Sequence, residues 1–374
     1  MKNTTSYKRL ESLDILRGID LFFLVFLQPV IAPLVQCIDN QTLNSLYYSI
    51  FTHVSWIGFH PWDLIMPLFM FMAGASMPFA FSAYHKGLIP TYQMLKRIAK
   101  RVVLLWLFGA LVQGNLLDLD LHSLRLFSNT LQAIAVGYFF AALLLMFCKL
   151  KTQVIITASL LIIYSIAMQV GGDFSADNNF AEQVDQLVLG RFRDGVSWDE
   201  AGNWNFASYY RYTWIFSSLN FIVTVMLGVF SGLIVKQKIS DIMKMKLLTG
   251  IGIVMLVSAF ALSFIEPIIK QLWTSSMTLY AGGWSFLLIA LFYWLIDVKQ
   301  CKKGFMWLKF YGMNSILAYM MYQLLDVTYP VTYWLHGLAQ FTGCYQNFII
   351  ELGKALLVLL ILRFCYKHNV FLKV

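Results

Sequence analysis

Charged residues are scarce in this sequence of 374 amino acids. Asp, Glu, Lys and Arg together make up 13% of the chain, whereas hydrophobic residues make up 59% and the mean hydropathy is +0.67. So few polar side chains cannot cover the surface of a soluble globule. The composition therefore excludes an ordinary soluble protein and predicts an all-α, polytopic protein embedded in a lipid bilayer.

Cysteines are also few, and none of the five lies at metal-ligand spacing from another cysteine or a histidine. We therefore predict no metal. The odd count leaves at least one cysteine unpaired, and we interpret all five as packing residues, with a bridge between Cys37 and Cys344 as the alternative. We expect no signal peptide, and we see no internal repeat, low-complexity tract or second-domain boundary, so we expect residues 1–374 to form a single transmembrane domain.

The net charge of +9 does not indicate nucleic-acid binding, because the basic residues are scattered between apolar segments. A membrane-spanning helix needs about 20 mostly apolar residues to cross a hydrocarbon core of about 30 Å. The segments that qualify predict about ten spans, at residues 15–36, 63–84, 98–116, 126–148, 153–171, 213–235, 246–265, 274–297, 305–326 and 346–366. Residues 330–343 contain a proline and are too few to cross, which predicts a re-entrant or interfacial piece.

The loops between these segments divide by charge. Lysine and arginine concentrate in the loops of one side, as in cytoplasmic loops, whereas the other side carries few basic residues among many acidic ones. We therefore predict that both termini are cytoplasmic. The longest loop, residues 172–212, falls on the outer side, and its many aromatic side chains favour an ordered cap.

Polar and ionisable residues directly precede a predicted apolar helix in the stretch HVSWIGFHPWDLIMPLFMFMAGAS, which begins at His53. Ionisable groups at a membrane boundary are costly to keep dry and are usually functional. We predict that His53 is a catalytic base or nucleophile and that Asp63 orients its ring or stabilises its imidazolium form. Trp56 and His60 are candidate substrate contacts, although the interfacial aromatics also suit a purely structural role for His60.

Charged residues inside or beside two other spans admit two interpretations each. Asp14, Arg17 and Asp20 are spaced three residues apart on the first span, which suits either a structural ion pair or a binding site. Two adjacent pairs of cations open the third span and form either a positive-inside anchor or a phosphate-binding patch: Lys96, Arg97, Lys100 and Arg101.

Polar residues also lie within the later spans. Gln132, Ser275 and Asn314 suit hydrogen bonding between helices or the lining of a polar cavity. We predict that these three side chains contact substrate.

Several of these motifs together resemble the heparan-α-glucosaminide N-acetyltransferase family, in its bacterial branch. Besides the stretch that begins at His53, the resemblance rests on SLDILRGID, KRVVLLWLFG, LQAIAVGYFFAAL, LGVFSG, LWTSSMTLYAGG and GMNSILAY, in this order along nearly the whole chain. It implies acetyl transfer from cytoplasmic acetyl-CoA to the amino group of a terminal glucosamine on the periplasmic side of a bacterial inner membrane, and it suggests a homodimer.

The resemblance also implies roles for individual residues. The family's active-site histidine falls on His53, its second-helix acid on Asp63, and its first-helix Arg-Gly on Arg17 and Gly18. The predicted donor contacts are Arg17, Asp20, Arg97 and Arg101. The sequence departs from the family at Gln28, where an asparagine is expected, at Ala133, where an arginine is expected, and in lacking Asp-Pro-Glu-Gly before the sixth span.

Two other functions suit the same features. A secondary transporter of an amino sugar also has intramembrane charges and polar spans, although no matched Gly/Pro-interrupted halves are visible in this sequence. An O-acetyltransferase of a surface glycan would use the same donor with a hydroxyl acceptor.

Overall fold

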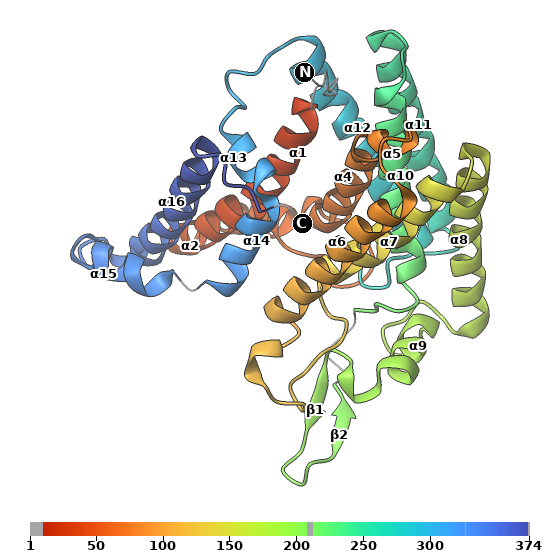
Figure 1. Cartoon of the computed structure of the whole chain (residues 1–374). Coiled ribbons are helices and arrows are strands. Elements are labelled where there is room, and N and C mark those ends of the chain that lie inside the picture. Colours follow the sequence, from red (N-terminus) through yellow and green to blue (C-terminus); the bar gives the residue numbers. More distant parts are fainter. Residues whose placement is uncertain (1–9, 208–211, 326, 373–374) are drawn as a thin grey trace. The chain divides into compact units, whose positions relative to one another are not determined.

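The computed structural model describes residues 10–207, 212–325 and 327–372 (Figure 1). Their regular secondary structure is helical except for one short two-stranded hairpin, which agrees with the predicted all-α class. The terminal residues on which the predicted orientation partly depends lie outside the described ranges, as do residues 208–211 of the predicted cap. The cytoplasmic placement of both termini therefore stays a prediction.

Seven of the predicted spans correspond to helices that are long and apolar enough to cross a membrane. This makes the chain a multi-pass membrane protein, and the seven are Glu11–Ile38, Pro61–His85, Thr130–Phe147, Leu150–Gly171, Ser218–Lys236, Asp241–Ser263 and Ser275–Val298. The first comprises α1 (Glu11–Phe22), a π-helical turn (Phe23–Leu27) and α2 (Gln28–Ile38). Pro29 lacks the N–H that would pair with the Val25 carbonyl, which accounts for the irregular turn before it.

The other three predicted spans are helical but differ in length or polarity. The third, α6 (Thr91–Val112), begins with the basic cluster, and the last, α16 (Gln346–Lys367), carries several charges along its length. Residues 305–326 form two short helices, α13 (Leu308–Met313) and α14 (Ser315–Leu324), interrupted at Asn314. The count of ten spans stays a prediction.

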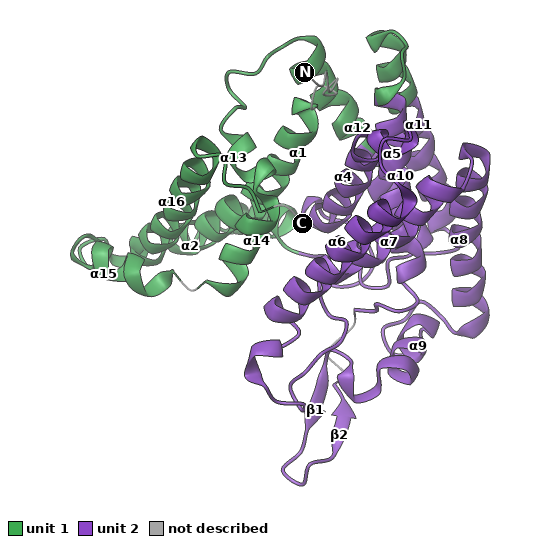
Figure 2. Cartoon of the chain, viewed as in Figure 1, with its two compact units in different colours: residues 1–52, 236–249, 286–373 green, residues 53–235, 250–285, 374 purple. Residues whose placement is uncertain are grey.

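The chain forms two compact units (Figure 2). Unit 1 comprises residues 1–52, 236–249 and 286–373, and unit 2 comprises residues 53–235 and 250–285. Each unit joins segments that are distant in the sequence. The single-domain organisation stays a prediction.

Close helix contact in unit 1 depends on two glycines. A Cβ at Gly18 of α1 would lie 2.0 Å from the Leu308 carbonyl oxygen, and one at Gly312 of α13 would lie 1.7 Å from the Asp14 carbonyl oxygen. Only glycine permits such an approach of two helix backbones. Unit 1 also contains α3 (Gln41–Phe51), which Asn40 caps through its side chain.

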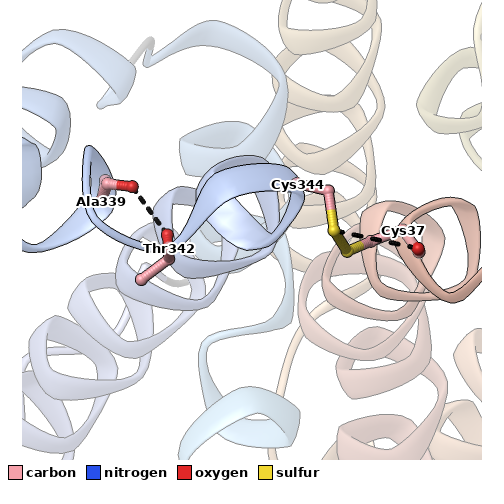
Figure 3. The surroundings of a disulfide bond; sticks show 4 residues. All are labelled: Cys37, Ala339, Thr342 and Cys344. Atoms are coloured by element: carbon pink, nitrogen blue, oxygen red, sulfur yellow. Dashed lines mark hydrogen bonds between the residues drawn. A yellow bond between two sulfur atoms is a disulfide. The ribbon is translucent and has the colours of Figure 1, made fainter.

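A disulfide joins Cys37, at the end of α2, to Cys344 (Figure 3). Interpreting these two cysteines as packing residues was therefore wrong, and the alternative bridge is present. Cys344 lies in a short turn after α15 (Thr328–Ala339), where the Thr342 hydroxyl donates to the Ala339 carbonyl at 2.6 Å. With 12 residues, α15 is about 18 Å long and too short to cross a bilayer, as predicted for this piece.

Unit 2 is built from α4 (Ile65–Ala80), α5 (Ser82–His85), α6, α7 (Thr130–Phe147), α8 (Leu150–Gly171) and α10 (Ser218–Lys236), with parts of α11 (Asp241–Ser263) and α12 (Ser275–Phe292). Small residues again bring backbones together. A Cβ at Gly74 of α4 would lie 2.0 Å from the Val225 carbonyl oxygen, and one at Gly228 of α10 would lie 1.9 Å from the Phe71 carbonyl oxygen. The helices α4 and α10 therefore pack backbone to backbone.

The loop at residues 172–212, called the outer loop after its predicted side, has regular secondary structure in its described residues. It contains α9 (Phe180–Leu189) and an antiparallel hairpin of β1 (Val196–Trp198) and β2 (Trp204–Phe206), which lie together at one end of unit 2 in Figure 1. Inside the loop, the buried guanidinium of Arg193 pairs with Glu182. The hairpin is the one strand pairing of this kind in the described ranges, and helical periodicity did not predict it.

Candidate active site

The local backbone brings His53 and Asp63 together across ten residues. Residues 52–60 are not helical, and Gly58, at φ +126°, adopts a conformation that disfavours a side chain. Pro61 then opens a 3-10 turn (Pro61–Leu64) that leads into α4. In this turn the Asp63 side chain folds back, so that its Oδ2 accepts the His60 backbone N–H at 2.9 Å.

The other Asp63 oxygen faces the imidazole. Oδ1 of Asp63 lies 2.6 Å from Nδ1 of His53, and the carboxylate is almost fully buried, with 1% of the side chain exposed. The His53 side chain is 41% exposed. A buried carboxylate therefore holds one ring nitrogen while the rest of the ring stays accessible.

A third charged residue, Lys270, completes the cluster. Its Nζ lies 3.1 Å from Nδ1 of His53 and 3.5 Å from Oδ1 of Asp63, and its side chain is only 7% exposed. Lys270 is one of the few basic residues on the side predicted to be outer, and no sequence pattern predicted its place beside His53. The available signal was a lysine between two apolar stretches, PII and LW, because a cation drawn into such surroundings needs a buried partner.

The segment that carries Lys270 is fixed against the segment that carries His53. The Gly58 backbone N–H donates to the Ile268 carbonyl at 2.9 Å, and Ile57 pairs with Ile269 in an antiparallel bridge. The Gln271 amide donates to the Val54 and Ser55 carbonyls at 3.1 and 3.2 Å. These bonds make the three-residue cluster part of the folded framework of unit 2.

The cluster shifts the protonation of its members. Desolvation lowers the pKa of His53 below its usual value; the hydrogen bond to Asp63 opposes this shift, and the Lys270 charge adds to it. Burial lowers the pKa of Lys270 to about 8, although the Asp63 carboxylate partly compensates. At neutral pH the imidazole is therefore mainly uncharged, as a base or nucleophile must be.

The chain is distantly similar to a membrane N-acetyltransferase. It is 26% identical to the human protein named heparan-alpha-glucosaminide N-acetyltransferase over 86% of this chain, and 24% identical to the mouse protein of the same name over 99%. The chain spans 54% of the human protein and 61% of the mouse protein. No family model matches the sequence.

The remaining predicted contacts near His53 are held by the framework. The Trp56 indole N–H donates to the Phe174 carbonyl at 2.9 Å, which ties the start of the outer loop to this segment. His60 is half-buried and precedes the 3-10 turn, where its carbonyl accepts the Asp63 backbone N–H at 2.9 Å. Neither bond tests a substrate role for these residues, which stays a prediction.

Three predicted polar contacts lie within other hydrogen-bond networks. Gln132 is fully buried in unit 2, accepting from Ser128 N–H at 2.9 Å and donating to the Leu126 carbonyl at 2.9 Å. The Ser275 hydroxyl donates to the Leu161 carbonyl at 3.1 Å. In unit 1, the Asn314 side chain donates to the Val370 carbonyl at 3.0 Å and accepts the Leu372 N–H at 3.1 Å. These bonds show how the side chains are held, and their roles toward substrate stay predictions.

The predicted donor contacts fall in both units. In unit 1, Asp14 and Asp20 are buried, and the nearest Arg17 nitrogen lies 3.9 Å from an Asp14 oxygen. In unit 2, Arg97 is exposed on α6, and the half-buried Arg101 lies with its guanidinium 4.3 Å from the centre of the Tyr138 ring. Binding of the donor by Arg17, Asp20, Arg97 and Arg101 stays a prediction.

Proposed function

We propose that this chain is a transmembrane acetyltransferase that moves an acetyl group from cytoplasmic acetyl-CoA to the amino group of a terminal glucosamine, or a related amino sugar, on the opposite side of the membrane. The single observation that carries this proposal is the His53–Asp63 pair, buried on the carboxylate side and open on the ring side. The distant similarity to a named N-acetyltransferase supports the choice of reaction.

The geometry favours Nε2 of His53 as the reacting nitrogen. Nδ1 is engaged by Asp63 and Lys270, so Nε2 is the ring nitrogen left to meet substrate. In direct transfer, Nε2 takes a proton from the amine as the amine nitrogen bonds the acetyl carbon. The thioester C–S bond breaks, and the thiolate of CoA leaves and takes up the proton.

A covalent route begins from the same nitrogen. Nε2 attacks the thioester carbonyl, the C–S bond breaks and CoA leaves as the thiolate. The amine then displaces the imidazole from the acetyl group, and the proton that the amine loses neutralises the thiolate. In both routes a positive charge develops on the ring, which the Asp63 carboxylate stabilises. The two routes differ in whether an acetylated His53 accumulates in the absence of an acceptor.

The basic residues of α6 are placed to receive a polyanionic donor. Asp63 lies two positions before the start of α4, whose 16 residues extend about 24 Å, and ten residues separate the end of α4 from the start of α6. Arg97 and Arg101 therefore lie toward the end of α4 that is distant from Asp63. CoA phosphates bound there leave the pantetheine arm to reach toward His53, and Arg17 and Asp20 are the further proposed donor contacts.

The disulfide supports an extracytoplasmic position for His53. Disulfides persist in oxidising compartments, which supports a position of Cys37 outside the cytoplasm. Only α3, 11 residues long, separates the end of α2 from His53, and about 16 Å of helix cannot recross the bilayer. We propose the bacterial inner membrane as the location, with the acceptor on the periplasmic side beside Trp56 and His60.

The test uses the purified full chain with labelled acetyl-CoA and glucosamine. Formation of N-acetylglucosamine with release of CoA supports the proposal, and the position of the label distinguishes N- from O-acetylation. Uptake of glucosamine into proteoliposomes without acetyl-CoA, and with no acetylated product, supports a transporter instead and overturns the proposal.

A further inference from the structure

Lys270 faces the histidine and carboxylate with which the proposed reaction begins. Its Nζ lies within 3.5 Å of both side chains, while the lysine and Asp63 are each more than nine-tenths buried. A buried charge without a partner costs several kcal/mol. The two buried charges therefore compensate each other, and His53 meets both of them at one nitrogen.

Without the lysine charge, the Asp63 carboxylate would act on His53 unopposed. A nearby carboxylate favours the charged imidazolium and makes the ring a poorer nucleophile at neutral pH. A cation beside the carboxylate offsets that effect while leaving the carboxylate ionised. The Nδ1–H can then still point to Asp63, which fixes the tautomer and leaves the Nε2 lone pair available.

We propose that Lys270 is a positioning residue that keeps Asp63 ionised and His53 neutral in the resting site, so that Nε2 is ready to react. The inference rests on the proposed function, since it assigns Lys270 a task in the same acetyl transfer. This role also accounts for the hydrogen bonds that fix the segment containing Lys270. The neighbouring residue Gln271 bonds two carbonyls beside His53, and its own carbonyl accepts the Thr213 N–H at 3.1 Å.

The other titratable groups near the cluster are His60 and Tyr212. The His60 charge, when present, also disfavours protonation of His53. Tyr212 stays neutral, because burial and the Asp63 charge raise its pKa to about 12. At neutral pH, Lys270 is therefore the main cation among the described groups that act on His53.

The experiment measures the protonation of His53 without acetyl transfer. Diethyl pyrocarbonate modifies the neutral imidazole, and mass spectrometry of the peptide containing residue 53 gives the rate of modification at each pH. The wild type is compared with Lys270→Met, which removes the charge, and Lys270→Arg, which keeps it. Lys151→Met, at an exposed position of α8, is the matched control.

Loss of the lysine charge is expected to raise the midpoint of this titration by about one pH unit. At a given pH on the acid limb, the neutral fraction of His53 is then about tenfold lower. Lys270→Arg and Lys151→Met should stay close to the wild type. The acid limb of kcat should move with the midpoint in Lys270→Met, while KM for acetyl-CoA stays unchanged. A midpoint that stays in place or falls in Lys270→Met overturns the proposal.

A charge-balanced variant keeps the test decisive if Lys270→Met does not fold. Lys270→Met combined with Asp63→Asn removes both buried charges, whereas Asp63→Asn alone keeps the lysine charge. If Lys270 disfavours protonation of His53, the midpoint of the double variant should lie above that of Asp63→Asn. A midpoint at or below that of Asp63→Asn contradicts this effect of Lys270. Because the readout needs no acetyl-CoA, a shifted midpoint in an enzyme that acetylates nothing separates failure of the proposed function from failure of this inference.

Discussion

Nδ1 of His53 lies 2.6 Å from Oδ1 of Asp63, whose second oxygen accepts the backbone N–H of His60. The carboxylate is thus held from both sides, by the ring and by the turn that starts the next helix. Its orientation is set by the fold rather than by the imidazole alone. The pair is therefore preorganised, which is what catalysis by a positioned base requires.

Replacing Asp63 by asparagine tests the value of this carboxylate. Asp63→Asn keeps the shape of the side chain but removes the negative charge that stabilises the imidazolium form. We expect kcat for acetyl transfer to fall by about 10²- to 10⁴-fold, with a much smaller change in KM for acetyl-CoA. A rate within a factor of three of the wild type would show that the carboxylate does not assist His53.

The pH dependence of the reaction follows from the state of His53. Because its pKa is lowered from 6.5, the reactive neutral form is present at neutral pH and is lost only as pH falls through the lowered value. We expect kcat to be level near pH 7 and to decline on an acid limb centred below 6.5. A limb centred clearly above 6.5 would contradict the electrostatic account.

The disulfide is expected to stabilise unit 1. Cys37→Ser removes a cross-link between residues 307 positions apart, and the loss should cost about 2–4 kcal/mol of stability. Thermal denaturation in detergent should show a lower midpoint for Cys37→Ser, with Cys344→Ser and the double variant equivalent to it. Cys148→Ser is the control, because Cys148 is a free cysteine. A double variant markedly less stable than either single variant would argue against the pairing.

Backbone contact between α4 and α10 predicts a sharp difference between two glycines. Gly228→Ala places a Cβ 1.9 Å from the Phe71 carbonyl oxygen, and the helices must separate, at a cost of about 1–3 kcal/mol. Gly250→Ala in α11 meets nothing within 4 Å and should be neutral or stabilising by about 1 kcal/mol. Size-exclusion chromatography after graded heating measures both, and equal stability of the two variants would refute the close contact.

The sequence was most informative where a local pattern determines the structure. Long apolar runs predicted the seven helices that are able to cross a membrane, and HVSWIGFHPWD placed His53 and Asp63 within one turn-rich stretch. Their pairing could be anticipated because Pro61 and Gly58 confine the chain between them. The motif resemblance agrees with the distant similarity to the named acetyltransferases.

Other features depend on contacts that are distant in the sequence. Lys270 is 217 positions from His53, and the two segments are held together by the backbone bridge between Ile57 and Ile269 and by the bonds of Gly58 and Gln271. The pairing of Cys37 with Cys344 likewise depends on how unit 1 folds. The hairpin in the outer loop could not be predicted from the sequence, because its strands have three residues each and are too short for a clear alternating pattern.

The most direct test of the central claim is the rate of acetyl transfer from acetyl-CoA to glucosamine by His53→Ala, compared with the wild type and with His85→Ala, an exposed histidine of α5. All three proteins should elute as folded species on size-exclusion chromatography. We predict that His53→Ala loses at least about 10³-fold in kcat while His85→Ala keeps the wild-type rate. Acetylation by folded His53→Ala at a rate close to that of the wild type would contradict the account.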